Sequence, residues 1–169
     1  MLPHSSKLYD IHFISSHLIS SHLVSSRLVS SHHSFSTTVL DEPGLFRLSG
    51  VKNEVIALHN KFDQDVDDID LSEFPIHVIT GALKHHLREQ TNPLVPFHLY
   101  NSFMDAYDKE ESEELRLEKL CNCIDRLPPE NKPIFGRLWV LLGAVVDHAD
   151  KNKMTANHLG YIFSTILSH

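Results

Sequence analysis

The sequence predicts an all-α fold: a helical bundle of about six helices over residues 41–169, preceded by a low-complexity tail. Two observations support this. Apolar residues recur at spacings of three and four through most of residues 41–169, which is the period of an amphipathic helix. The alternation of apolar and polar residues that indicates strands is almost absent there. The segments between the periodic stretches are short, as they are between neighbouring helices of a bundle.

The helix boundaries come from capping residues and helix breakers. Ser49 is a suitable N-cap for the first helix, and Thr155 for the last. Pro75 suits the start of the second helix, and the sequence TNPL ends it. The acidic stretch DQDVDDIDLSEF between these two helices is expected to be a solvated loop. The expected helices are 50–62, 75–89, 96–108, 109–127, 128–150 and 156–168, of which 128–150 is apolar on most sides and should be the central one.

Residues 1–40 differ from the rest of the chain. They contain the repeat SSHLISSHLVSSRLVSSHHS, whose period of five matches neither a helix face nor a strand face. We expect this tail to be disordered and without function. The alternative is a transit peptide, because the tail is rich in serine and poor in acidic residues; its two basic residues, Lys7 and Arg27, are few for that role.

The composition excludes several classes of protein. A net charge of −7 argues against nucleic-acid binding, which needs a basic patch, and against adhesion to anionic lipid. Two cysteines, Cys121 and Cys123, are too few for a disulfide framework, so we expect a cytoplasmic protein. No apolar stretch is long enough for a transmembrane segment. The 14 histidines lack the spacing of a helical zinc site, so we expect them on solvated surfaces and expect no metal.

The most distinctive segment is DEPGLFRLSG, residues 41–50. It places one arginine, Arg47, between apolar residues and flanks them with Gly44 and Gly50. In the second expected helix, Lys84 and Arg88 are four residues apart and therefore project from the same face. Taken alone, each of these features is also typical of an ordinary loop or an exposed helix face.

Five segments taken together carry a family resemblance. In chain order they are GLFRLSG, IHVITGALKHHLRE, NPLVPFHLYNSFMDA, LPPEN and NKMTANHLGYIF. This series resembles the GTPase-activating domain for Rho-family small GTPases, the RhoGAP domain. Within this family, the segment IHVITGALK is most similar to the branch that contains the chimaerins and related multidomain proteins. The resemblance covers about residues 41–169.

The resemblance implies that Arg47 is an arginine finger, which a GTPase-activating protein inserts into the active site of its partner. It implies that Gly44, Phe46, Ser49 and Gly50 support the finger loop. Glycine would permit the turn and a close approach to the partner. Leu45, Phe46 and Leu48 would pack the base of the loop.

The resemblance also implies a partner and the residues that meet it. The partner would be a Rho-family small GTPase in its GTP-bound form. Lys84 and Arg88 would brace the finger loop and contact the switch regions of the GTPase, and Asn157 or His158 would lie nearby. The domain would be an activator of another enzyme rather than an enzyme, and it would need no cofactor.

Two departures from the family pattern leave alternatives open. The family asparagine that follows Met-Thr falls on His158, and Asn157 stands one residue early, which turns its side chain by about 100° on a helix. The helix that precedes the finger in the family, and the helices after YIF, are not recognisable, so we expect a domain truncated at both ends. The alternatives are a module that binds a GTPase without activating it, and a non-functional fragment.

Overall fold

The computed structural model describes residues 39–64, 69–106 and 111–167, and the regular structure within these ranges is entirely helical. The elements are α2 (Lys52–Asp63), the 3-10 helix η1 (Leu71–Glu73), α3 (Ile76–Glu89), α4 (Phe97–Asp105), α5 (Glu113–Asp125), α6 (Asn131–Asp147), α7 (Ala149–Asn152) and α8 (Ala156–Leu167). The all-α prediction is confirmed. The described residues form seven α-helices instead of about six, because the stretch expected as one helix over 128–150 breaks at His148 and gives α6 and the short α7.

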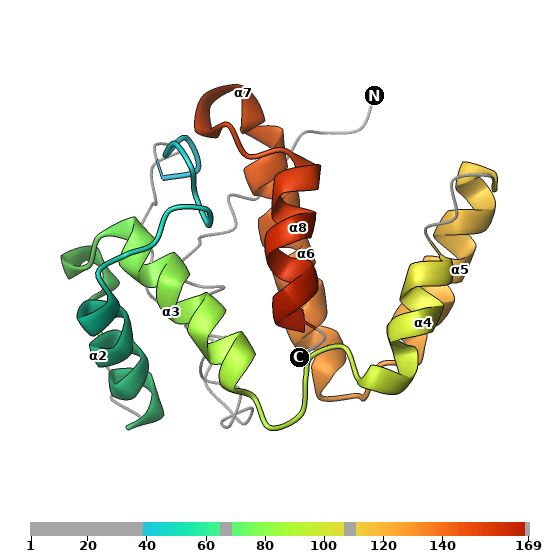
Figure 1. Ribbon diagram of the computed structural model, residues 1–169, viewed down its shortest axis with the longest axis horizontal. Helices are drawn as coiled ribbons and strands as arrows, with labels where there is room; N and C mark the ends of the chain where they lie inside the picture. The colour runs from blue at the N-terminus through green and yellow to red at the C-terminus, as the bar shows by residue number, and fades with distance from the viewer. Residues whose placement is uncertain (1–38, 65–68, 107–110, 168–169) are drawn as a thin grey trace, which may run out of the picture.

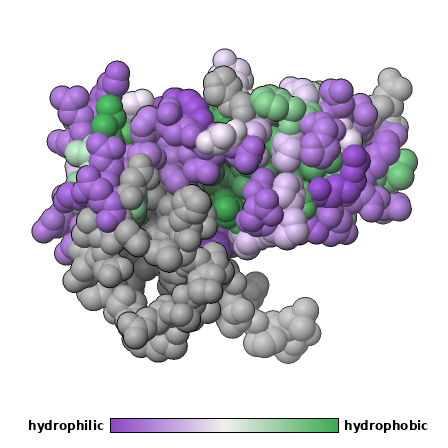
Figure 2. Space-filling view, turned by 90° about the horizontal axis from the view of Figure 1, so that it is seen from below, coloured by the Kyte–Doolittle hydropathy of each residue, from purple (hydrophilic) through white to green (hydrophobic). Residues whose placement is uncertain are grey.

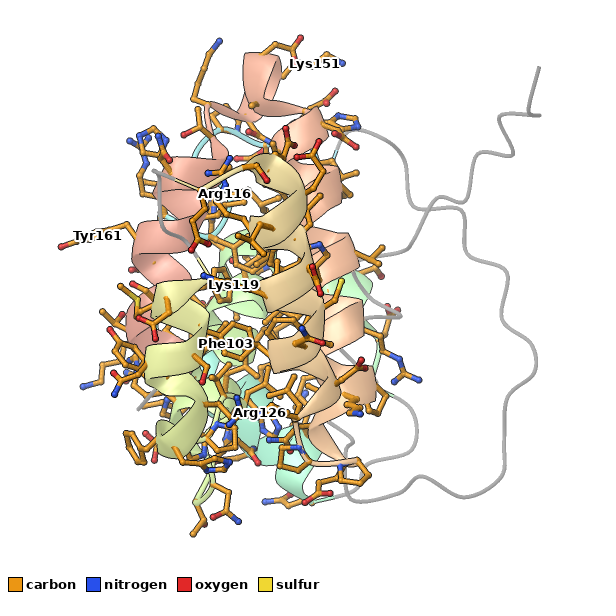
Figure 3. The ribbon with its side chains drawn as sticks, turned by 90° about the vertical axis from the view of Figure 1, so that its right-hand side faces the viewer. Phe103, Arg116, Lys119, Arg126, Lys151 and Tyr161 are labelled. Carbon is orange, nitrogen blue, oxygen red and sulfur yellow. The ribbon has the colours of Figure 1, made fainter. Side chains whose placement is uncertain are left out.

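The helices form three groups in Figure 1. Helices α2 and α3 pack side by side, α8 lies against both α3 and α6, and α4 and α5 form a hairpin that extends to one side. The short α7 lies at one end of α6, close to the loop over residues 41–50. The side view in Figure 3 looks onto the α4–α5 hairpin, with Lys151 of α7 at one end of the molecule and Arg126 toward the other.

The main hydrophobic core is formed by apolar residues that recur at helical spacing and so lie on one face of each helix. It joins the loop at Leu45 and Phe46 to one face each of α3, α6 and α8. Phe103 of α4 reaches this core through the ring of Phe135, with centroids 6.0 Å apart. Leu117 of α5 is exposed. The serine- and histidine-rich repeat lies outside the described residues.

A second apolar cluster lies between α2 and α3. Leu58, Val78, Ile79 and Ala82 are its buried members from the two helices. His59 and His86 lie between the same helices and are each 8% exposed, so the expectation that the histidines lie on solvated surfaces is wrong for these two. The two rings pack against each other with centroids 5.6 Å apart, and Nε2 of His86 lies 2.9 Å from the side-chain nitrogen of Gln90.

The start of α2 differs from the prediction. The helix begins at Lys52, two residues later than expected, with Val51 at the N-cap position and no side-chain cap. Ser49 is exposed and does not cap the helix. Thr155 does cap α8 as predicted, because its Oγ1 accepts a hydrogen bond from the His158 N–H at 3.4 Å.

An open apolar groove of about 440 Å³ runs between α6 and α8. Its lining includes Trp139, Leu142 and Gly143 from α6 and Ala156, Gly160 and Ser164 from α8. Trp139 is 57% exposed, so the helix expected to be the most central one carries an apolar outer face. On the face of the molecule seen in Figure 2, hydrophobic residues likewise reach the surface between hydrophilic ones.

Two further observations concern the described residues. None of their helices has the length and hydrophobicity needed to cross a membrane. Cys121 is exposed and Cys123 is buried, and both are free thiols.

Candidate functional site

The backbone of the loop around Arg47 forms a tight turn. The carbonyl oxygen of Gly44 accepts hydrogen bonds from the N–H groups of Arg47 and Leu48, at 2.8 and 2.9 Å. Gly44 has a φ of +73°, which glycine adopts without a steric cost. Phe46 has a φ of +67°, where a residue with a side chain is strained by about 1–3 kcal/mol. The surrounding packing must therefore hold Phe46 in place.

The packing that does so lies directly beneath the turn. The side chains of Leu45 and Phe46 are fully buried in the main core. The Phe46 ring meets the ring of Phe163 on α8 edge to face, with centroids 5.3 Å apart. Leu48 was expected to pack here but is 46% exposed, because the turn directs it to the surface. The turn thus has two apolar anchors on one side of Arg47.

Arg47 itself is exposed at the top of this turn. Within the described part of the chain, its guanidinium has no hydrogen-bond or salt-bridge partner. A guanidinium carries its charge at any ordinary pH and presents five N–H donors. The loop therefore offers a charged and available donor group on a braced backbone.

Lys84 of α3 supplies one brace. Its Nζ donates a hydrogen bond to the carbonyl oxygen of Phe46 at 2.5 Å. Burial, and to a lesser degree the charge of Arg88, lower the pKa of Lys84 below its usual value. The hydrogen bond fixes the peptide group that joins Phe46 to Arg47. The expected contact of Lys84 with the Arg47 loop is thus seen in the geometry, and Arg88 lies exposed one turn further along α3.

Gly50 closes the loop against α3. A Cβ atom at this position would lie 2.7 Å from both the Cα and the N atom of Val78. No side chain fits there, so glycine is needed for a close approach of two backbones within the chain. The φ of Gly50 is not in the left-handed region, which means that the turn itself depends on Gly44 and not on Gly50.

Residues of α7 and its junctions hold the other end of the loop, and the sequence had not indicated them. The Gly44 N–H donates to the carbonyl oxygen of Asn152 at 2.8 Å. Asp41 accepts a hydrogen bond from Lys151 at 2.8 Å and lies 2.6 Å from Nδ1 of His148. Lys151, and after it His148, lower the pKa of Asp41. Asn152 stands within the motif NKMTANHLGYIF, but its position there carried no sign of this contact.

Comparison with known proteins assigns the family. The family model of the RhoGAP domain matches residues 28–169, which is most of the chain. The chain belongs to the RhoGAP domain family. The resemblance stated from the five sequence segments is therefore confirmed, while its placement in the chimaerin-like branch stays a prediction.

Individual relatives support the assignment. The chain is 37% identical over 126 residues to Rho GTPase-activating protein gacY of Dictyostelium discoideum, a match that covers 74% of this chain and 17% of that protein. The crystal structure of human Rho GTPase activating protein 15 has a TM-score of 0.67 at 32% identity, with 76% of this chain and 62% of that one covered. The structure of the BH domain from GRAF, the GTPase regulator associated with focal adhesion kinase, has a TM-score of 0.73 at 29% identity, with 94% and 81% covered. The chain thus spans less than a fifth of the length of gacY.

In this RhoGAP domain, Asn157 and His158 lie in the first turn of α8. Both side chains are exposed, and His158 Nδ1 accepts a hydrogen bond from the Thr155 N–H at 3.5 Å. Across residues 39–64, 69–106 and 111–167, no hydrogen bond or ion pair joins either side chain to the Arg47 loop. The structure therefore brings Lys84 to the Arg47 loop but leaves Asn157 and His158 facing solvent. No group of three or more potential metal ligands occurs among the residues that the structure describes.

Proposed function

We propose that this RhoGAP domain accelerates GTP hydrolysis by a Rho-family small GTPase, and that Arg47 is the residue it inserts into the partner. The observation that carries the proposal is an exposed guanidinium, without a bonding partner among the residues that the structure describes, on a loop backbone held on both sides by Lys84 and Asn152. A side chain that enters the active site of another protein must be exposed, and its backbone must be held in one position so that the charged group arrives in the correct place.

The chemistry follows from the charge that develops during phosphoryl transfer. Negative charge spreads over the oxygens of the transferring group, and an arginine supplied in trans stabilises it. For other GTPases such a finger is worth about 10³–10⁵ in kcat. Arginine suits the role because its planar fork donates several hydrogen bonds and keeps its charge when it is desolvated.

The proposal extends to the surface around the finger. Lys84 and Arg88 lie on the α3 face that leads to the loop, and Asn157 and His158 lie on the first turn of α8. We assign Arg88, Asn157 and His158 to the contact with the GTP-bound partner, because all three are exposed. The free thiols of Cys121 and Cys123 support the cytoplasmic location in which such a partner would be met.

The test is phosphate release from GTP-loaded Rho, Rac and Cdc42-type proteins. We expect wild type to accelerate at least one of them and Arg47→Ala to lose about 10³-fold or more of the acceleration. Arg126→Ala is the matched control, because Arg126 is also exposed but lies toward the opposite end of the molecule from α7. Its hydrogen bond to Ser102 Oγ, at 3.2 Å, joins the end of α5 to α4 and does not involve the Arg47 loop. Equal acceleration by wild type and Arg47→Ala would exclude the finger role.

A second candidate function is binding without activation, and His158 is the observation that favours it. An imidazole there offers a different hydrogen-bonding group from the amide that the family pattern places at this position. If the second function is correct, wild type binds the GTP-bound partner without raising its hydrolysis rate, and His158→Asn raises that rate. An unchanged rate in His158→Asn would show that this position does not limit activity.

A further inference from the structure

Asn152 is a fully buried polar residue at the end of α7, more than 100 residues from Arg47 in the sequence. Its side-chain Nδ2 donates to the carbonyl oxygens of Leu40 and Val145, both at 2.8 Å. Its Oδ1 accepts from the Met154 N–H at 2.7 Å. Both amide hydrogens and the amide oxygen are therefore used, which is the condition under which a buried amide is tolerated.

These contacts tie three segments of the chain to one side chain. Leu40 leads into the Arg47 loop, Val145 belongs to the last turn of α6, and Met154 begins the connection to α8. Between them, Lys153 adopts a left-handed conformation with a φ of +63°, which turns the chain back so that the Met154 N–H faces Asn152. The position of Asn152 is thus set by α6 and by the start of the α8 segment.

From this fixed position, a series of backbone hydrogen bonds leads to Arg47. The carbonyl oxygen of Asn152 accepts the Gly44 N–H at 2.8 Å, and the carbonyl oxygen of Gly44 accepts the Arg47 N–H at 2.8 Å. Lys84 holds the opposite side of the turn through the carbonyl oxygen of Phe46. Without the Asn152 side chain, the carbonyl oxygen that accepts the Gly44 N–H would lose its fixed position. The turn would then depend on Lys84, on the buried Leu45 and Phe46 and on the contacts of Asp41.

We propose that Asn152 is a positioning residue for Arg47. Its buried amide fixes the backbone carbonyl that accepts the Gly44 N–H, and the carbonyl oxygen of Gly44 in turn fixes the backbone N–H of Arg47. This inference rests on the proposed function of Arg47. Asn152 does not meet the GTPase, since it is buried, so it acts only through the loop. Its loss should therefore reduce the rate of the activated reaction and leave the affinity for the partner in place.

The experiment compares wild type with Asn152→Ala on a responsive GTPase, below the melting temperature of both. A misplacement of about 1 Å can cost roughly 10²-fold in rate, so we expect kcat to fall about 10- to 100-fold with KM within about twofold. Affinity for the partner loaded with GDP and aluminium fluoride, a transition-state mimic, should fall with kcat, while affinity for the partner loaded with a non-hydrolysable GTP analogue should not. Ile166→Ala is the control for simple destabilisation, because Ile166 is a buried core residue near the other end of α8.

Asn152→Ser supplies a milder change in case Asn152→Ala does not melt cooperatively. Its hydroxyl can make part of the hydrogen bonds, so we expect a smaller fall in kcat and faster hydrogen exchange at Gly44 and Arg47 than in Ile166→Ala. Wild-type kcat in a folded Asn152 variant, or a rise in KM with unchanged kcat, overturns the inference. A different result would overturn the proposed function: Arg47→Ala activates the GTPase as well as wild type. In that case the inference about Asn152 is wrong as well, because it depends on the role of Arg47.

Discussion

Replacement of Gly50 by alanine is the sharpest test of how tightly the finger loop is set against α3. The new Cβ would lie 2.7 Å from the Cα and N atoms of Val78 and 2.8 Å from the carbonyl carbon of His77. All three are backbone atoms inside or beside the first turn of a helix, so none can rotate away. Reaching an ordinary contact of at least 3.4 Å from 2.7 Å requires a displacement of about 0.7 Å between loop and helix.

The size of the effect follows from this displacement. Overpacking of this kind costs about 1–3 kcal/mol of the free energy of unfolding. Each kcal/mol lowers the melting temperature of a domain of this size by roughly 3–5 °C. Because Gly50 closes the loop that carries Arg47, a shift of this size should also lower the stimulated hydrolysis rate by up to about 10²-fold.

Gly136→Ala is the matched control. Gly136 lies within α6, and a Cβ atom there would have no heavy atom within 4 Å. Alanine in an open helical position should stabilise by about 0.5–1 kcal/mol, because glycine loses more backbone entropy on folding. Thermal melts and hydrolysis assays on both variants decide the matter. If Gly50→Ala melts and activates like wild type, the backbone contact between the loop and Val78 is not as the structure has it.

Two further substitutions test the anchors of the loop. Phe46→Ala removes a fully buried ring from the core and its contact with Phe163, so we expect a loss of about 3–5 kcal/mol in a denaturant titration; a loss below 1 kcal/mol would contradict the anchoring role. Asp41→Asn removes the ion pairs with Lys151 and His148, and we expect its destabilising effect to depend on pH. The folded state lowers the pKa of Asp41 and raises that of Lys151, so the stability that the pair contributes is fully present between their ordinary pKa values of about 4 and 10. It is lost as pH falls below this window through the lowered pKa of Asp41, or rises above it through the raised pKa of Lys151. Melts of wild type and Asp41→Asn should therefore converge at low pH; a constant difference would mean that the carboxylate charge is not what stabilises the loop.

The sequence predicted the features that depend on local spacing. The apolar stripe of α3 and the cap at Thr155 are confirmed, because helical period and capping are properties of neighbouring residues. Ser49 failed as a cap because the chain around it is set by the contact between Gly50 and Val78, which only the tertiary structure shows. The break between α6 and α7 at His148 was missed for a similar reason, since this junction is tied to Asp41.

The candidate site could be predicted in part. The resemblance indicated Arg47 and Lys84, and the structure shows Lys84 hydrogen-bonded to the loop that carries Arg47. The strain at Phe46 and the role of Asn152 could not be predicted, because a phenylalanine and an asparagine are both compatible with many conformations and burial is not visible in one sequence. Where the site depends on contacts between distant segments, spacing along the chain gives no indication of it.

The long-range attachment of the finger loop has a consequence for the order in which the domain folds. Leu40 and Asn152, which are hydrogen-bonded, are 112 residues apart in the chain. Contacts of such high sequence separation form late, because a large loop must be closed before they contribute. The adjacent helices α2 and α3 can pack much earlier. During synthesis, Arg47 leaves the ribosome more than 100 residues before Asn152, yet its loop should become ordered only after α7 has been made. In a refolding experiment followed by hydrogen exchange, the amides of α2 and α3 should be protected before those of Gly44 and Arg47.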